Sequence, residues 1–69
     1  MENLNVGVFG AAGKMGATTC QAINNDDSMN LRLGVDVNQA GTLIPSTSLQ
    51  IEETVQNLEG IDVIIDFTV

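Results

Sequence analysis

The chain has 69 residues, and a chain of that length buries only about 60% of the surface that it exposes when unfolded. We therefore expect one small unit with a limited core. Of its residues 43% are hydrophobic but only two, Phe9 and Phe67, are aromatic, so aliphatic side chains must form the core, as is typical of parallel sheets. Nine acidic and two basic residues give a net charge of −7, which argues against nucleic acid or an anionic membrane as a partner.

The cysteine and histidine content limits the chemistry further. Cys20 is the single cysteine, so it cannot form an internal disulfide, and no histidine is present for a Cys/His metal cluster or for acid/base catalysis. We predict neither a metal site nor a catalytic residue. The beginning of the chain lacks the pattern of a signal peptide, and no apolar run approaches the roughly 20 residues of a membrane span. A soluble protein of the reducing cytoplasm is the expectation.

The first elements are a strand and a helix. The apolar run from Leu4 to Phe9 predicts a buried strand that a tight turn at Gly10 ends. After the glycines, apolar and small residues recur at helical spacing to about residue 25: Met15, Thr19, Ala22 and Ile23. This spacing predicts one amphipathic helix, in which we expect Met15 and Cys20 to pack rather than to carry chemistry.

The second half predicts a weaker alternation. Residues 31–37 indicate a strand with Asp36 near its end, and residues 38–47, which include Gly41 and Pro45, indicate a loop. We expect a short strand over 48–51 and a short helix from Glu52 to the residue before Gly60. Residues 61–67 predict a strong final strand.

This order of elements predicts an α/β fold, namely a Rossmann-type half domain. Right-handed crossovers would give a parallel sheet of about four strands in the order 3-2-1-4, with helices on both of its faces. The carboxyl ends of the first and last strands would then meet at a topological switch point, where open α/β sheets bind their ligands.

The main functional motif is a strand, then Gly10, Gly13 and Gly16, then a helix, with Asp36 placed 20 residues after the last glycine. This order is typical of a dinucleotide-binding loop. Gly10 would make the turn, Gly13 would allow the backbone to approach a pyrophosphate, and Gly16 would allow close packing of the helix on the strand. The alternative is that the glycines only close a strand-to-helix turn.

Three further positions could contact a dinucleotide. Lys14 offers a charge partner for a phosphate, although a solvated lysine is the alternative. Asp36 could accept hydrogen bonds from both hydroxyls of an adenosine ribose and would repel a 2′-phosphate, which favours NAD over NADP; a solvated carboxylate is the alternative. Phe67 and Thr68 could face the nicotinamide side, with core packing as the alternative for Phe67.

Three segments together resemble dihydrodipicolinate reductase, also called 4-hydroxy-tetrahydrodipicolinate reductase. They are residues 8–16 (VFGAAGKMG), 34–36 (GVD) and 62–69 (DVIIDFTV), and the resemblance spans nearly the whole chain. The family uses NADH or NADPH in lysine and diaminopimelate synthesis. The resemblance implies that the pyrophosphate is lined by Gly10, Ala11, Ala12, Gly13, Lys14 and Met15. It also implies that Asp36 holds the ribose and that Phe67 and Thr68 lie near the nicotinamide.

We therefore interpret residues 1–69 as the N-terminal NAD(P)-binding segment of such a reductase, which reduces a cyclic imine acid. The family's separate substrate domain, with its histidine pair and lysine, has no counterpart here, so we expect no catalysis by these residues alone. The alternatives are a free-standing truncated module that binds a nucleotide or associates with itself, and a dinucleotide module of another dehydrogenase family. Apolar surface left uncovered by so few helices predicts a homo-oligomer.

Overall fold

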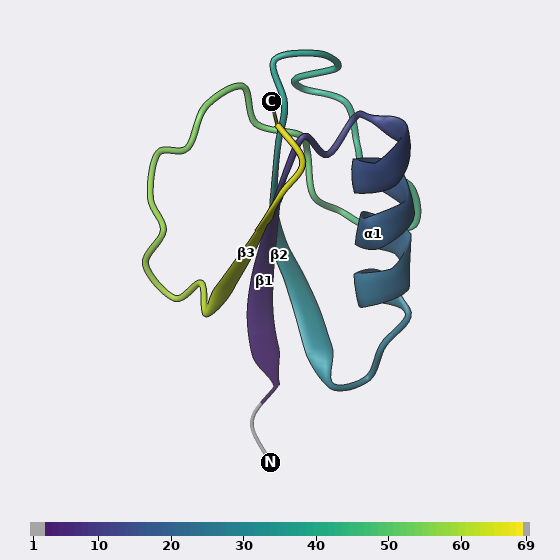
Figure 1. Ribbon diagram of the computed structural model, residues 1–69, viewed down its shortest axis with the longest axis vertical. Helices are drawn as coiled ribbons and strands as arrows, with labels where there is room; N and C mark the ends of the chain where they lie inside the picture. The colour runs from purple at the N-terminus through teal and green to yellow at the C-terminus, as the bar shows by residue number, and fades with distance from the viewer. Residues whose placement is uncertain (1–2, 69) are drawn as a thin grey trace.

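The computed structural model describes residues 3–68. It consists of a parallel sheet with one helix on one face, in the chain order β1 (Leu4–Phe9), α1 (Lys14–Asn24), β2 (Met29–Val35) and β3 (Val63–Asp66) (Figure 1). The strand order is β2-β1-β3. The predicted α/β class and the central position of the first strand are confirmed, but the predicted four strands in the order 3-2-1-4 are wrong for the described residues, which form three.

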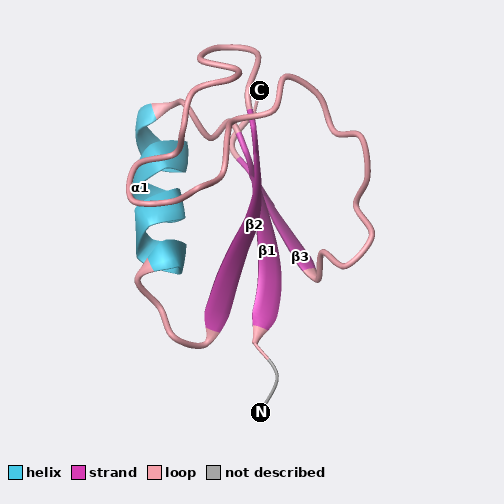
Figure 2. Cartoon of the chain, turned by 180° about the vertical axis from the view of Figure 1, so that it is seen from behind, coloured by secondary structure: helices cyan, strands magenta, loops and turns pink. Residues whose placement is uncertain are grey.

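The core lies between α1 and the central strand. Val6 and Val8 of β1 are fully buried on the face that α1 covers, together with Cys20 and Ile23 of the helix. Because α1 carries apolar side chains on one face only, burial of that face fixes the helix against β1 and β2. The helix does not reach β3, which is one of the two edge strands of the sheet (Figure 2).

The predicted strand over 48–51 forms no extended strand. Residues 42–51 instead fold back on themselves: the Ile51 amide donates to the Thr42 carbonyl, and the Ile44 amide donates to the Leu49 carbonyl. Only Glu52 reaches the sheet, through a single parallel bridge to Val35. Glu52 does lie beside β2, where the third strand was expected, but the backbone groups of residues 42–51 are already paired within the fold-back.

The predicted helix after Glu52 is also absent, so the expectation of helices on both sheet faces is wrong for residues 3–68. Local side-chain bonds replace helical ones: the Asn57 carboxamide oxygen accepts from the Glu59 amide at 2.7 Å, and the Gln56 side chain donates to the Thr54 hydroxyl at 3.0 Å. Such local bonds compete with helix formation, and helices this short are marginal without tertiary packing.

The predicted bounds of the remaining elements shift by a few residues. The second strand begins at Met29 and ends at Val35 rather than spanning 31–37, and the last strand is limited to Val63–Asp66. Asp36 therefore follows β2 directly. Among the residues that the structure describes, no helix has both the length and the apolar character that a membrane span requires.

Candidate functional site

The turn after β1 lies where all three strands end. The Gly10 and Ala11 amides both donate to the Val35 carbonyl, at 2.8 and 3.1 Å, and the Phe67 amide donates to the Phe9 carbonyl at 2.9 Å. Gly10 has φ +83°, and a Cβ at this position would lie 3.2 Å from the Cβ of Phe67. A residue with a side chain would be strained in this conformation, so the turn requires glycine.

Gly16 brings the helix against this turn. A Cβ on Gly16 would lie 2.7 Å from the Gly10 carbonyl carbon and 3.0 Å from the Ala11 Cα. Both are backbone atoms, which cannot swing aside as a flexible side chain can. The first turn of α1 is therefore packed directly on the strand-to-helix turn, which agrees with the packing role predicted for Gly16.

The amino end of α1 is open to a ligand. Gly13 is the N-cap and supplies no side-chain cap, and the first intrahelical bond runs from the Ala17 amide to the Gly13 carbonyl at 2.8 Å. The amides of Lys14, Met15 and Gly16 precede that bond and have no acceptor within the helix. Beyond its two chain neighbours, the one described atom within 4 Å of a Cβ built on Gly13 would be the Gly10 oxygen, at 3.4 Å. An anion can therefore approach three amides and the positive end of the helix dipole.

Asp36 connects this loop to the end of β2. One carboxylate oxygen accepts the Ala12 amide and the other accepts the Asn38 amide, each at 2.9 Å. The Asp36 amide donates to the Glu52 carbonyl at 2.9 Å, which holds the backbone of the residue as well. The carboxylate is thus fixed beside the loop rather than free in solvent.

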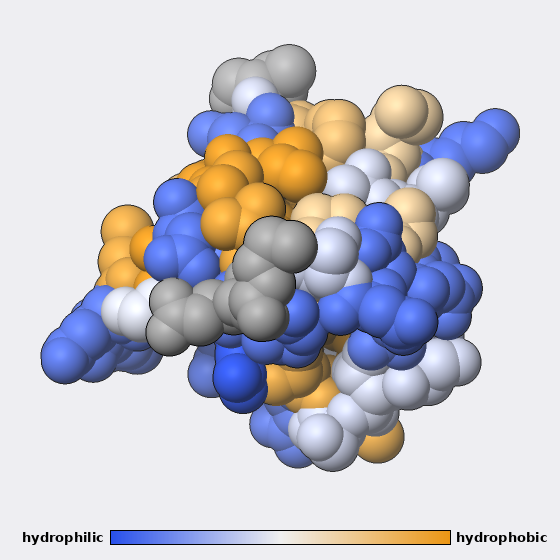
Figure 3. Space-filling view, turned by 90° about the horizontal axis from the view of Figure 1, so that it is seen from below, coloured by the Kyte–Doolittle hydropathy of each residue, from blue (hydrophilic) through white to orange (hydrophobic). Residues whose placement is uncertain are grey.

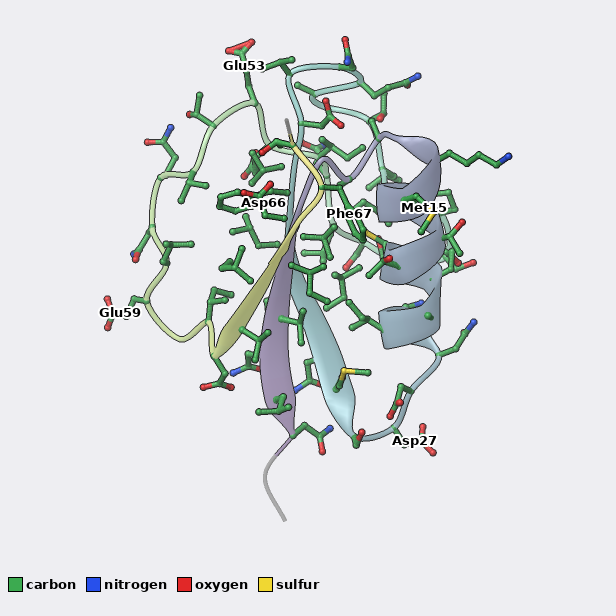
Figure 4. The ribbon with its side chains drawn as sticks, in the orientation of Figure 1. Met15, Asp27, Glu53, Glu59, Asp66 and Phe67 are labelled. Atoms are coloured by element: carbon green, nitrogen blue, oxygen red, sulfur yellow. The ribbon has the colours of Figure 1, made fainter. Side chains whose placement is uncertain are left out.

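The glycine turn, the amino end of α1 and the residues after β2 and β3 line an open cleft of about 540 Å³ at the carboxyl end of the sheet. Its lining brings together seven of the nine residues predicted to bind the cofactor: Gly10, Gly13, Lys14, Met15, Asp36, Phe67 and Thr68. Figure 4 shows Met15 at the start of α1 and Phe67 after β3, both at this end of the molecule. The structure thus brings residues from three separate segments to one cleft.

Two predicted site residues do not line the cleft. Ala11 is buried at 4% exposure, and Ala12 packs against the core, so both methyl groups point away from the cleft. Three residues outside the predicted set do line it: Gly16, Val37 and Asn38. The sequence could have indicated them by their positions, since Gly16 belongs to the glycine motif and Val37 and Asn38 follow Asp36 directly.

Asp66 and Thr68 form a local turn at the end of β3. The Thr68 hydroxyl donates to the Asp66 carboxylate at 2.5 Å, and the Thr68 amide donates to the same oxygen at 2.8 Å. These two bonds, the hydroxyl's first, lower the pKa of Asp66 below its usual value. Since its proton is directed to Asp66, the Thr68 hydroxyl is left with acceptor positions only at the edge of the cleft.

The cleft is chemically suited to binding. Lys14 and Asp36 are its ionisable side chains, so it offers one cation near the helix amino end and one acceptor near the end of β2. Within residues 3–68, no group of three or more His, Cys, Asp or Glu side chains is arranged to hold a metal ion. Amide donors for phosphate and a carboxylate for hydroxyls are the groups that a dinucleotide requires.

A parallel sheet with a glycine turn, an open helix amino end and an acid after the second strand defines the nucleotide-binding half of a Rossmann-like fold. A family model described as dihydrodipicolinate reductase, N-terminus, matches residues 4–69. The chain belongs to this family, as its motifs predicted. Searches of curated proteins and of solved structures gave no match.

Proposed function

We propose that this chain is the cofactor-binding part of an NAD(P)H-dependent 4-hydroxy-tetrahydrodipicolinate reductase and binds the dinucleotide in the cleft at the carboxyl end of the sheet. Its family is that of the N-terminal nucleotide-binding part of dihydrodipicolinate reductase, whose members bind a nicotinamide dinucleotide. The observation that carries the proposal is the helix amino end at Gly13, which presents three amides without intrahelical acceptors to the cleft.

The pyrophosphate would lie over Gly13. The amides of Lys14, Met15 and Gly16 would donate to its oxygens, and the Lys14 side chain would add a charge. Apart from Lys14, the chain has one other basic side chain, Arg32, which is not part of the cleft lining. The net charge of −7 repels an anionic ligand, and the Lys14 side chain offsets part of this repulsion at the cleft.

The adenosine ribose would lie against Asp36, whose carboxylate lines the cleft beside Val37 and Asn38. A carboxylate accepts hydrogen bonds from the two ribose hydroxyls but repels a 2′-phosphate. We therefore propose that NADH is preferred and that NADPH binds more weakly. Phe67 and Thr68, on the opposite side of the glycine turn, would contact the nicotinamide side of the dinucleotide.

We test the site by titrating NADH into the wild type and two variants of equal charge. Lys14→Gln removes the cation of the cleft, whereas Arg32→Gln removes the cation outside it. We expect Lys14→Gln to raise the Kd for NADH about tenfold, which corresponds to 1.4 kcal/mol, and Arg32→Gln to change it much less. Equal effects of the two variants would mean that only net charge matters, and would contradict the site.

Cofactor preference has its own test. Asp36→Ala should weaken NADH binding more than NADPH binding, because it removes an acceptor for the ribose and a repulsive charge for the 2′-phosphate. Asp27→Ala is the matched control, since Asp27 is exposed at the opposite end of the molecule (Figure 4). Equal losses for the two cofactors in Asp36→Ala would contradict the ribose assignment.

We also propose that these residues do not reduce the substrate by themselves. The cleft offers Lys14 and Asp36 as its ionisable groups, and both are assigned to cofactor binding. Reduction of a cyclic imine acid needs a substrate site and a proton donor in addition to the hydride from the cofactor. Addition of substrate to the chain with NADH should therefore give no oxidation of NADH, measured by its absorbance.

A second candidate, association with other copies of the chain, is favoured by β3. Within residues 3–68 this strand has no partner at its outer edge, and Val63 and Ile64 on its two faces are 39% and 36% exposed. Figure 3 shows apolar residues at the surface, among hydrophilic ones, at the end where the strands begin. We propose that the chain forms a homo-oligomer, strengthened by salt because salt screens the −7 charge. A stable monomer in sedimentation at micromolar concentration would contradict this.

A further inference from the structure

We propose that Asp36 has a second role as a positioning residue: it ties the glycine loop to the end of β2 and so fixes the helix amino end before any ligand arrives. The proposal rests on the proposed function and deepens it. The observation behind it is that the Asp36 carboxylate, beyond facing the cleft, accepts the Ala12 amide at 2.9 Å across 24 residues of sequence.

The Ala12 amide donates to a side chain, the Asp36 carboxylate, whereas the neighbouring amides of the loop donate to backbone carbonyls. The Gly10 and Ala11 amides are bonded to the Val35 carbonyl, and the Gly13 amide turns back to the Gly10 carbonyl. Ala12 lies between the buried Ala11 and the N-cap residue, and its bond to Asp36 is partly buried. Without that carboxylate, a partly buried donor would lose its partner, which costs free energy unless the loop moves to meet water.

The carboxylate can hold the loop and a ribose at the same time. An ionised carboxylate has two oxygens with about four acceptor positions. Each Asp36 oxygen accepts one backbone amide, from Ala12 and from Asn38, so each keeps an acceptor position for a ribose hydroxyl. The two functions therefore add rather than compete.

The same bonds explain why Asp36 would discriminate against a 2′-phosphate. A solvated aspartate can rotate away from an approaching anion at little cost. The Asp36 carboxylate is held by the Ala12 and Asn38 amides, and the backbone of the residue is held by its bond to Glu52, so rotation of the side chain would break at least one of the two carboxylate bonds. Binding of NADPH would thus either bring two anions together or release the glycine loop.

The test compares Asp36→Asn with Asp36→Ala, which remove the same charge. Asn keeps an oxygen that can accept the Ala12 amide, whereas Ala does not. The first measurement is amide hydrogen exchange by NMR, with the Val8 amide of the central strand as the reference for global unfolding. We expect exchange at Ala12, relative to Val8, to be at least tenfold faster in Asp36→Ala than in the wild type, with Asp36→Asn between them.

The second measurement uses inorganic pyrophosphate, which has no ribose and so reports on the loop alone. We expect Asp36→Ala to bind pyrophosphate at least threefold more weakly than Asp36→Asn, because only Asn can restrain the loop. Equal pyrophosphate binding by the two variants, or equal acceleration of exchange at Ala12 and Val8, would overturn the positioning role. Failure of NADH to bind at all would instead contradict the proposed function, since the Ala12 measurement needs no cofactor.

Discussion

Substitution of two glycines of the same motif, one at the N-cap of α1 and one in its first turn, separates helix packing from the approach of a ligand. Gly16→Ala places a methyl group against the backbone of Gly10 and Ala11, with its Cβ 2.7 Å from the Gly10 carbonyl carbon. Gly13→Ala places one where the nearest atom beyond the two chain neighbours is the Gly10 oxygen at 3.4 Å, an ordinary contact. The two variants make the same chemical change three residues apart, so each is the control for the other.

The expected cost differs because only Gly16 meets rigid neighbours. Overpacking costs about 1–3 kcal/mol, and contact with backbone favours the upper end, whereas the gain from replacing a helical glycine by alanine is about 0.5–1 kcal/mol. We expect a net loss of about 2 kcal/mol for Gly16→Ala, or roughly 8–16 °C in Tm for a domain of this size. For Gly13→Ala, the weaker N-cap and the smaller unfolded-state entropy offset each other, so stability should change by less than about 0.5 kcal/mol.

Thermal unfolding by circular dichroism and NADH titration measure the two effects. Gly13→Ala should fold normally but raise the Kd for NADH about tenfold, because its methyl group occupies the space over the helix amino end. A Tm for Gly16→Ala within about 3 °C of the wild type would refute the packing argument. Unchanged NADH affinity in Gly13→Ala would refute the approach of a phosphate to this position.

Three further predictions concern other parts of the molecule. Gly34→Ala should destabilise the fold, because its Cβ would lie 2.6 Å from the Ile44 Cδ1, and Ile44→Val should partly rescue it by removing that atom; additive losses in denaturant unfolding would contradict this. Burial raises the pKa of the Cys20 thiol, so a thiol reagent should label native protein far more slowly than unfolded protein, and equal rates would refute the burial. The Thr68 bonds lower the pKa of Asp66, so their stabilisation of the fold is present above the ordinary aspartate pKa, about 4, and is lost as the pH falls through the lower pKa of the folded state. Asp66→Asn should therefore reduce the loss of stability at acid pH, and an unchanged loss would contradict this.

The site was more predictable than the second half of the fold. The glycine spacing and Asp36 lie in a local pattern whose physical demands, a left-handed turn at Gly10 and close packing at Gly16, leave few alternative residues. Phe67 and Thr68 could be placed near them because the final strand was expected to run parallel to the first and beside it, and neighbouring parallel strands end at the same edge of the sheet. The bond from Asp36 to the Ala12 amide was not predictable, because it depends on side-chain rotation rather than on spacing.

The segment between β2 and β3 was predicted less well because its local signals are weak. Glu52 and Glu53 suit a helix start, but the following residues have few apolar positions to bury, and Asn57 bonds within its own turn. Ile44 and Ile51 are buried by folding residues 42–51 back on themselves, which pairs backbone groups that a strand would have offered to β2. Hydrophobic spacing does not distinguish these two ways of burying the same side chains.

The central claim is that the cleft at the carboxyl end of the sheet binds a nicotinamide dinucleotide. An NMR titration of the isotopically labelled chain with NADH tests it most directly, because each amide reports on its own position. We predict saturable shifts concentrated at Lys14, Met15, Gly16 and Asp36, with Arg32 and Asp27 unaffected. Absence of shifts at millimolar NADH, or shifts concentrated away from the helix amino end, would contradict the claim.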